Sequence, residues 1–280
     1  MSPDRKVRKA VIPAAGKGTR LLPLTRTVPK EMLPLGRKPV LHHIVDELLE
    51  AGICQVLFVI SDDKTCIPRY FDDGSDRFQS VIQPRQRGLA DATLYGEDFA
   101  GGDPVAVALG DSVITSGESK HVTRRLIEAY ESLDAGCVIA VEEVPVADAS
   151  RYGIVKPKGD AGDVFEIDDL IEKPPAGNLP SNLAIAGRYV VDPVIYDMIR
   201  GLEPGALGEL QLTDAIRMLL RGGHRVWCVR LRKSEKRTDI GTFASYFEAL
   251  IQACCRDEEL GERMRTVAAE EIAGAAICER

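Results

Sequence analysis

The stretch PVLHHIVDELLEAG, residues 39–52, decides the fold class. Its apolar residues recur at positions 40, 41, 44, 45, 48 and 49, which is the spacing of one helix face, and Gly52 supplies a C-terminal stop. Short runs rich in Val and Ile, at 7–12 and 56–60, flank this helix, and a third follows at 105–109. These runs are apolar on both faces, as buried parallel strands are. Strand, helix and strand together predict a βαβ unit.

The alternation continues along the chain. It predicts strands at 137–141, 153–155, 184–191 and 225–231, an exposed edge strand at 164–167, and helices at about 193–199 and 210–220. We therefore expect an α/β fold with a Rossmann-like, mostly parallel sheet flanked by helices. No long linker divides it, so we expect one domain over residues 1–242 and a helical C-terminal tail over 243–280, with breaks near Gly261 and Gly274.

Composition excludes several classes of protein. The 280 residues include 36 Lys and Arg against 43 Asp and Glu, a net charge of −7, which argues against a nucleic-acid polymer as partner. No apolar run approaches the roughly 20 residues of a membrane span. The charged N-terminus lacks a leader-like apolar region, and the seven cysteines form no C-x-x-C pair. We expect a cytoplasmic location without a membrane partner.

A glycine-rich segment, AAGKGTR at 14–20, follows the first strand. It is not a Walker A loop, because position 11 is Val where that pattern needs Gly, and it is not the dinucleotide fingerprint, because Leu21 stands where a third Gly is needed. The remaining pattern, G-x-G-T-R, places Arg20 beside glycines whose amides can approach phosphate oxygens. An ordinary tight turn is the alternative.

The segment PKEMLPL, residues 29–35, adds a second cation ten residues after Arg20. Lys30 could close on the same triphosphate, although a lone lysine is usually a solvated surface charge. Together the two segments resemble the sugar-1-phosphate nucleotidylyltransferases, and most of all the branch that uses UTP and glucose 1-phosphate. The resemblance implies that Arg20 and Lys30 are catalytic cations and that the nucleotide binds at Ala14, Ala15, Gly16, Gly18 and Thr19.

Two further segments resemble the family's nucleotide side. VIQP at 81–84 and RGLADA at 87–92 are similar to its base-recognition strand and turn, which implies that Gln83 and Gly88 bind the base. A glutamine amide both donates and accepts, as a pyrimidine edge requires, whereas the alternative for Gln83 is a surface polar residue. Asp111 ends the strand VAVALGD, at the strand end where ligands of open α/β sheets collect; a turn cap is the alternative.

The sugar side is implied by RYGIV at 151–155, IEKP at 171–174, GRYV at 187–190 and GELQLTDA at 208–215. By this resemblance Gly153, Glu172 and Gly187 bind the sugar phosphate, and Lys173 both binds its phosphate and is catalytic. Asp239, in TDIGT at 238–242, supplies a second carboxylate. Asp111 and Asp239 are the predicted Mg²⁺ ligands, since this hard ion binds through one or two carboxylates plus phosphates.

The predicted reaction joins UTP and glucose 1-phosphate into UDP-glucose and pyrophosphate by in-line attack on the α-phosphate. The segment DIGT departs from the uridylyl pattern and resembles the thymidylyl branch, so a thymidylyltransferase or another sugar-1-phosphate nucleotidylyltransferase stays open. A non-catalytic nucleotide-sugar sensor is a rival of another class. Loss of a charged residue of the predicted catalytic set would favour it, but all five are present: Arg20, Lys30, Asp111, Lys173 and Asp239. A nicotinamide oxidoreductase is disfavoured by Leu21.

The tail raises the question of assembly. Phe243, Tyr246, Phe247, Leu250 and Ile251 recur at helical spacing and form an apolar face. This face packs either on the chain's own sheet or against a second subunit. Because the resembling family forms dimers and tetramers, we expect a homo-oligomer.

Overall fold

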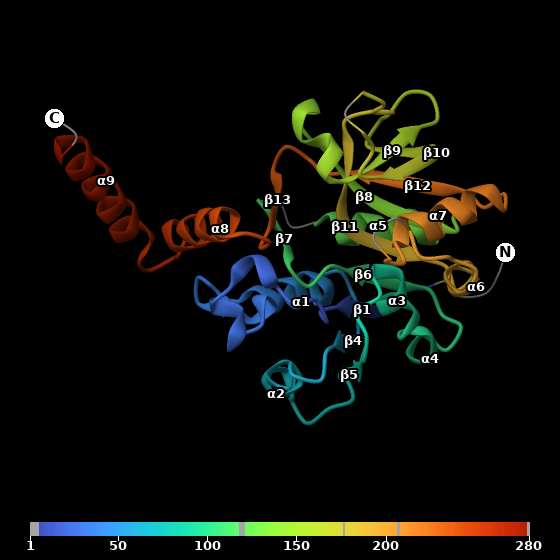
Figure 1. Ribbon diagram of the computed structural model, residues 1–280, viewed down its shortest axis with the longest axis horizontal. Coiled ribbons are helices and arrows are strands. Elements are labelled where there is room, and N and C mark those ends of the chain that lie inside the picture. Colours follow the sequence, from blue (N-terminus) through green and yellow to red (C-terminus); the bar gives the residue numbers. More distant parts are fainter. Residues whose placement is uncertain (1–5, 118–120, 176, 206–207, 279–280) are drawn as a thin grey trace.

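A nine-stranded sheet forms the centre of the computed structural model, which describes residues 6–117, 121–175, 177–205 and 208–278 (Figure 1). The strand order is β5-β4-β1-β6-β11-β8-β12-β10-β9. The strands are β1 (Lys9–Pro13), β4 (Gln55–Ile60), β5 (Phe78–Ile82), β6 (Val105–Ala108), β8 (Cys137–Glu143), β9 (Gly153–Pro157), β10 (Val164–Glu172), β11 (Leu183–Val191) and β12 (Val226–Arg230).

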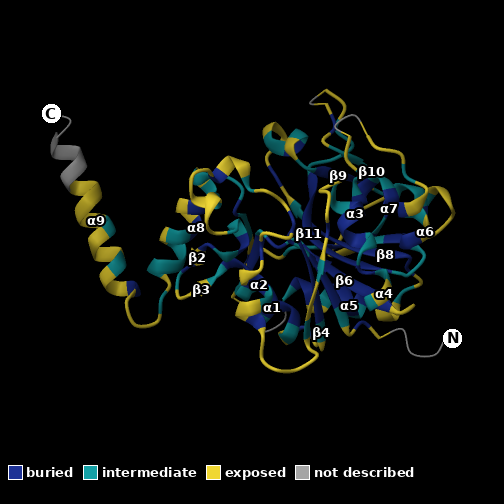
Figure 2. Cartoon of the chain, turned by 60° about the horizontal axis from the view of Figure 1, so that its bottom comes forward, coloured by how far each residue is buried: buried dark blue, intermediate teal, exposed yellow. Residues whose placement is uncertain are grey.

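Helices cover both faces of this sheet, as the α/β prediction requires. Side chains alternate between the faces along each strand: in β1, Ala10 and Ile12 join the core beneath α1 (Val40–Glu50) and α5 (Val122–Ser132), while Val11 joins the core beneath the other helices. Figure 2 shows this buried centre in dark blue. The opposite face carries α3 (Leu89–Leu94), α6 (Ile195–Arg200) and α7 (Leu212–Arg221).

Parallel pairing is confined to part of the sheet. The strands β5, β4, β1 and β6 run parallel, and so do β8 and β12. The strand β11 is antiparallel to both of its main neighbours, and β9–β10 and β10–β12 are antiparallel pairs. Parallel neighbours need a crossover connection, which is usually a helix. The described residues that connect β9 to β10 and β10 to β11 contain no helix. The α/β class is confirmed, with a mixed second half in place of the expected mostly parallel sheet.

The prediction of an exposed edge strand at 164–167 is wrong. The strand β10 extends to Glu172 and lies between β12 and β9. The alternating polar residues of this segment suggested an edge because one of its faces is partly exposed. The strand β9 takes the outer position, and a single pair between Ala184 and Ile154 also joins it to β11.

Two smaller pieces sit beside the sheet. The strands β7 (Ser112–Ser116) and β13 (Glu235–Asp239) form an antiparallel ladder, and β2 (Pro34–Leu35) and β3 (Lys38–Pro39) form a hairpin. The shorter helices are α2 (Cys66–Phe71) and α4 (Glu97–Ala100). Neither strand of the β7–β13 ladder was predicted. For β13 the reason is that EKRTD at 235–239 carries no apolar alternation.

The C-terminal tail consists of α8 (Phe243–Cys255) and α9 (Gly261–Cys278). Helix α8 begins with a capping box between Thr242 and Ser245 and packs on the body, where Tyr246 donates to the carbonyl of Pro34. Helix α9 projects away from the body (Figure 1) and continues through Gly274, where a break was expected. None of the helices in the described part of the chain is both long enough and apolar enough to cross a membrane.

Candidate active site

The glycine-rich loop follows β1 at the carboxyl edge of the parallel strands. The amide of Ala14 donates to the carbonyl of Val59, and a 3₁₀ turn (Thr19–Leu21) ends the loop. Between them, the backbone N–H groups of residues 15–18 donate to no acceptor among the described residues. Unpaired successive amides form a site for an anion. The loop holds Ala14, Ala15, Gly16, Gly18 and Thr19, the predicted nucleotide-binding residues.

Lys30 lies beside this loop. It begins a 3₁₀ turn (Lys30–Met32), and its Nζ is 2.5 Å from Oδ2 of Asp111. Burial opposes the lysine's charge, but the carboxylates of Asp111 and Glu31 outweigh burial and raise the pKa of Lys30 above its ordinary value. Lys30 therefore brings a permanent cation to the first predicted metal ligand.

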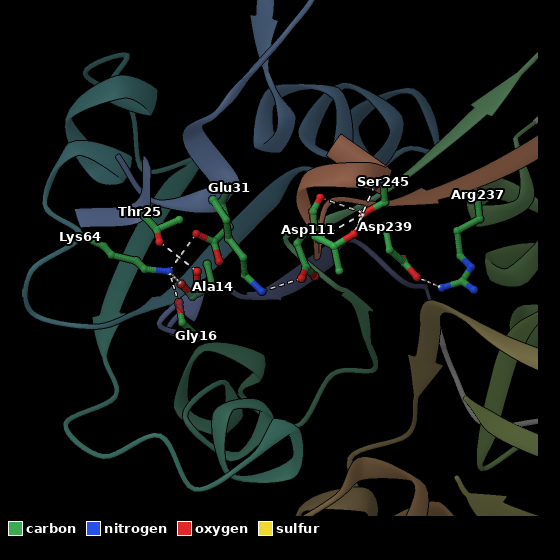
Figure 3. A network of polar contacts seen from close by, with 12 residues as sticks. Ala14, Gly16, Thr25, Glu31, Lys64, Asp111, Arg237, Asp239 and Ser245 are labelled. Carbon is green, nitrogen blue, oxygen red and sulfur yellow. Dashed lines mark hydrogen bonds and ion pairs between the residues drawn. The ribbon is translucent and has the colours of Figure 1, made fainter. Parts of the chain in front are cut away.

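The two predicted metal ligands lie side by side at one end of the β7–β13 ladder, Asp239 as its last paired residue and Asp111 just before β7 (Figure 3). Asp239 pairs with Ser112 across the ladder, and the amide of Ile240 donates to the carbonyl of Asp111 at 2.7 Å. Lys30 and Asp111, which are 81 positions apart in the sequence, are thus in contact, with Asp239 beside them, as the resemblance implied. This ladder therefore brings a carboxylate late in the chain beside Asp111.

Arg237 is a third cation at this point, and we did not predict it. Its guanidinium donates to the carboxylates of Glu142 and Asp239 and lies 4.8 Å from the ring centre of Tyr152. Burial raises the pKa of Glu142, and Arg237 opposes that rise. The residues Arg237 and Asp239 are two apart on one strand and so share a face. That spacing was the signal that the sequence offered.

The predicted sugar-binding residues meet at the ends of β9 and β10. Glu172 accepts a hydrogen bond from Thr213 at 3.2 Å, and burial raises its pKa, partly opposed by Lys173. A Cβ on residue 153 would lie 3.0 Å from Oε2 of Glu172 and closer still to Ile185, so only glycine leaves room there. Lys173 adopts a φ of 45°, rare for a residue with a side chain, while its amide donates to the carbonyl of Tyr152. Such strain is common at functional sites.

Gly187 sits where the pairing of β11 with β8 is interrupted, and its carbonyl accepts from the amide of Leu109. The next residue, Arg188, is 1% exposed and donates to Glu47 at 3.0 and 2.7 Å and to the carbonyl of Ser112 at 2.8 Å. This buried pair joins α1 to the backbone beside Asp111. No sequence signal separates it from a surface pair, since its partners are 141 residues apart.

Most of these residues open into one cavity of about 700 Å³, which we call the main cavity. It brings together seven of the predicted residues: Arg20, Asp111, Gly153, Glu172, Lys173, Gly187 and Asp239. A second cavity, of about 500 Å³, lies beside the glycine-rich loop and is lined by Lys17, Lys30 and Lys64 among others. Two polyanions could meet across these neighbouring, cation-lined spaces.

The two predicted base-binding residues lie elsewhere. Gln83 is 2% exposed, and its Nε2 donates to Asp91 at 2.6 Å. A Cβ on Gly88 would lie 2.4 Å from the carbonyl oxygen of Leu210, whose amide donates to the carbonyl of Arg87 and whose carbonyl accepts from the amide of Ala90. The structure thus joins the RGLADA turn to the GELQLTDA segment, and neither Gln83 nor Gly88 lines the two cavities.

The carboxylates suit a metal that arrives with phosphate. Within the described ranges, no group of three or more His, Cys, Asp or Glu side chains is placed to hold an ion alone. Asp111 and Asp239 place two carboxylates on one cavity, and Mg²⁺ is typically held by one or two carboxylates together with substrate phosphates. The residues present therefore fit the predicted ion.

Comparison with known proteins gives a consistent picture. A family model described as nucleotidyl transferase matches residues 9–254. The UTP–glucose-1-phosphate uridylyltransferase 2 of Staphylococcus saprophyticus is 37% identical over 284 residues, covering 93% of this chain and 96% of that protein.

Solved structures agree with the sequence relatives. A crystal structure of UDP-glucose pyrophosphorylase complexed with UDP-glucose has a TM-score of 0.82 at 34% identity, covering 87% of this chain and 97% of that one. The UTP-bound enzyme of Acinetobacter baumannii has a TM-score of 0.85 at 30% identity, covering 94% and 99%. With the family model matching most of its length, this chain belongs to the nucleotidyl transferase family.

Proposed function

We propose that this chain transfers the uridylyl group of UTP to glucose 1-phosphate, releasing pyrophosphate and forming UDP-glucose. The observation that carries the proposal is the main cavity, which joins Arg20 and the two aspartates to the Glu172–Lys173 pair. Relatives whose names state this reaction are similar to the chain over nearly its whole length.

The chemistry needs charge and alignment more than proton transfer. The attacking phosphate oxygen of glucose 1-phosphate is ionised at neutral pH, so no general base is required. Two polyanions must be brought together and the charge on the leaving pyrophosphate stabilised. We assign Arg20, Lys30 and the amides of the glycine-rich loop to the triphosphate, and Lys173 to the sugar phosphate. Glu172 accepts hydrogen bonds from the sugar hydroxyls.

We assign Asp111 and Asp239 as the residues that hold Mg²⁺. When bound, the ion neutralises charge on the phosphate oxygens. In this structure Lys30 contacts Asp111 and Arg237 contacts Asp239, so each cation must share or release its carboxylate. For the base, Gln83 and Gly88 remain our proposed contacts, Gln83 through the side chain that Asp91 holds in place.

The rival reactions are less well supported. The Staphylococcus saprophyticus relative reported above carries the uridylyl name, which disfavours a thymidylyltransferase. The relatives reported above are named for catalysis of this reaction, which disfavours a non-catalytic sensor.

Pyrophosphate release from a panel of nucleoside triphosphates, each with glucose 1-phosphate and Mg²⁺, tests the proposal. We expect UTP to give the highest kcat/KM and UDP-glucose as product, with activity lost on chelation and restored by Mg²⁺. Preference for dTTP would move the chain to the thymidylyl branch, and UTP binding without turnover would favour the sensor.

Two broader assignments accompany this function. We place the enzyme in the cytoplasm, because the six described cysteines are all free thiols, as a reducing compartment allows. We also propose a homo-oligomer, with residues 1–242 as the catalytic domain and 243–280 as the tail that carries the contact.

A further inference from the structure

A buried lysine that the proposed chemistry does not use lies behind the glycine-rich loop. Lys64 follows β4, in a turn where its amide donates to the carbonyl of Ser61, and it is 4% exposed. Its Nζ lies 2.6 Å from the carbonyl oxygen of Ala14, 2.7 Å from that of Gly16 and 2.8 Å from Oε2 of Glu31 (Figure 3). An ammonium group has three N–H donors, so every donor has a partner.

The first two contacts orient the loop. In a trans peptide the carbonyl and the following N–H point in opposite directions. With the carbonyls of Ala14 and Gly16 turned onto Lys64, the amides of Ala15 and Lys17 point away from it. These amides belong to the run, residues 15–18, that donates to no described acceptor. Lys64 thus holds the loop with its donors directed outward.

The third contact reaches the other half of the triphosphate site. Glu31 is 1% exposed and belongs to the same 3₁₀ turn as Lys30. Through Glu31, Lys64 connects the loop amides to the turn that presents the Lys30 cation to Asp111. One buried ion pair therefore connects the two elements that we assign to the triphosphate.

Stability alone is a weak reason for such a pair. Burial raises the pKa of Glu31, with Lys64 opposing the rise, so burial disfavours the charge of this carboxylate. Replacing a buried ion pair with apolar residues of similar volume is often neutral or stabilising. A role in shaping the glycine-rich loop explains why Lys64 and Glu31 form a buried ion pair behind it.

We infer that Lys64, with Glu31, is a positioning residue that sets the outward direction of the loop amides and their distance from Lys30. The inference rests on the proposed function, since it assigns those amides and Lys30 to the nucleotide triphosphate. All three ammonium N–H groups of Lys64 already donate to Ala14, Gly16 and Glu31, so we expect its loss to act through the loop although Lys64 borders the second cavity.

The test compares Lys64→Met and the double variant Lys64→Met/Glu31→Met with the full-length wild type. We expect UTP affinity by calorimetry to fall at least ~10-fold in both, the scale of one lost hydrogen bond to a charged group. The KM for UTP rises equally, while the KM for glucose 1-phosphate stays within about 2-fold because the Glu172–Lys173 side is untouched. The double variant leaves no unpaired buried charge, so it keeps the test decisive if Lys64→Met folds poorly.

Tyr130→Phe is the matched control. It removes a hydrogen bond of 2.7 Å from a fully buried side chain to Asp192, away from both cavities, and should lower Tm without changing either KM. Wild-type UTP affinity in the double variant, or an equal rise in both KM values, would overturn the inference. Failure of the proposed function looks different: the wild type would then form no UDP-glucose, and the variants would be compared with it on whichever nucleoside triphosphate it binds.

Discussion

The carboxyl group of Glu172 is partly buried, and this burial disfavours its charged form. Burial raises its pKa above the ordinary 4.5, and Lys173 and Thr213 only partly oppose the rise. A raised folded-state pKa means that protonation stabilises the fold at low pH. That stability is complete below the unfolded-state pKa and is lost as pH rises through the folded-state value. At neutral pH the ionised group therefore lowers the free energy of unfolding.

We expect Glu172→Gln to raise Tm at pH 7, with the difference from wild type shrinking as the pH approaches 4.5. The same variant should lower kcat/KM for glucose 1-phosphate by about 10- to 100-fold, since hydrogen bonds to charged groups contribute about 1.5–3 kcal/mol. Melting curves from pH 4 to 8 and steady-state kinetics measure the two effects. A lower Tm at pH 7 would show that the Thr213 contact outweighs the burial of charge.

The two cations assigned to the triphosphate should each matter strongly. We expect Arg20→Ala and Lys30→Ala to lower kcat/KM by about 100-fold or more, the scale of removing one preorganised charge from a developing anion. Lys9→Ala is the control, because Lys9 also forms an ion pair, at 2.8 Å with Asp103, but lines neither cavity. Near-wild-type turnover in Arg20→Ala and Lys30→Ala would refute these roles.

At this scale the sequence predicts site residues that lie in short segments. Glu172 and Lys173 are adjacent and Arg20 ends a glycine-rich loop, so a local pattern sufficed to propose all three, and the structure places them on the main cavity. Lys64 and Arg188 were missed because their roles come from carbonyls and carboxylates distant in the chain. A lone lysine or arginine looks the same in sequence whether it is buried or solvated.

Between elements, the contact of the turn at 87–90 with the segment at 208–212 depends on Gly88. Its φ is 111°, and a Cβ at this position would lie only 2.4 Å from the Leu210 carbonyl oxygen, so both the backbone conformation and the space exclude a side chain. We expect Gly88→Ala to lower stability by about 1–3 kcal/mol or more, from backbone strain and overpacking together.

Gly74→Ala separates these two causes. Gly74 also has a positive φ, 73°, but a Cβ there would meet nothing within 4 Å. Chemical denaturation of both variants therefore isolates the close approach from the backbone conformation. Equal losses in the two variants would show that the Leu210 contact is not the determinant.

The sheet shows which elements a pattern can predict. The apolar runs at β1, β4 and β6 and the amphipathic helix α1 were readable because strands buried on both faces and one-sided helices have distinct periods. The order and direction of strands β8 to β12 could not be predicted in this way. The antiparallel pairing of β11 with β6 and β8 follows from the chain connections rather than from hydropathy. The β7–β13 ladder, which brings Asp239 beside Asp111, gave no apolar signal at β13.

At the scale of the whole molecule, the tail divides into two helices with different surroundings. Helix α8 packs on the body through Tyr246 and Ala249, which are 6% and 5% exposed. Helix α9 projects outward (Figure 1) and carries exposed Val267 and Ile272, and Leu260 just before it is exposed as well. Helix α8 therefore covers the body with one side, but Phe247 and Ile251 on the same helix are 51% and 59% exposed, so apolar residues of both tail helices lack a cover within the described chain.

We expect the intact chain to form a dimer or larger closed assembly at micromolar concentration, because exposed apolar residues on a projecting helix are stabilised by a second copy. Ending the chain after Leu260 removes α9 and leaves α8 and every assigned site residue in place, so light scattering should report a smaller species with kcat per chain within about 2-fold of wild type. Val267→Glu/Ile272→Glu keeps the full length and should dissociate the assembly in the same way, because it places charge on the apolar positions. An intact chain that runs as a monomer, or a truncated chain that keeps the size of its intact assembly, would contradict a contact through α9.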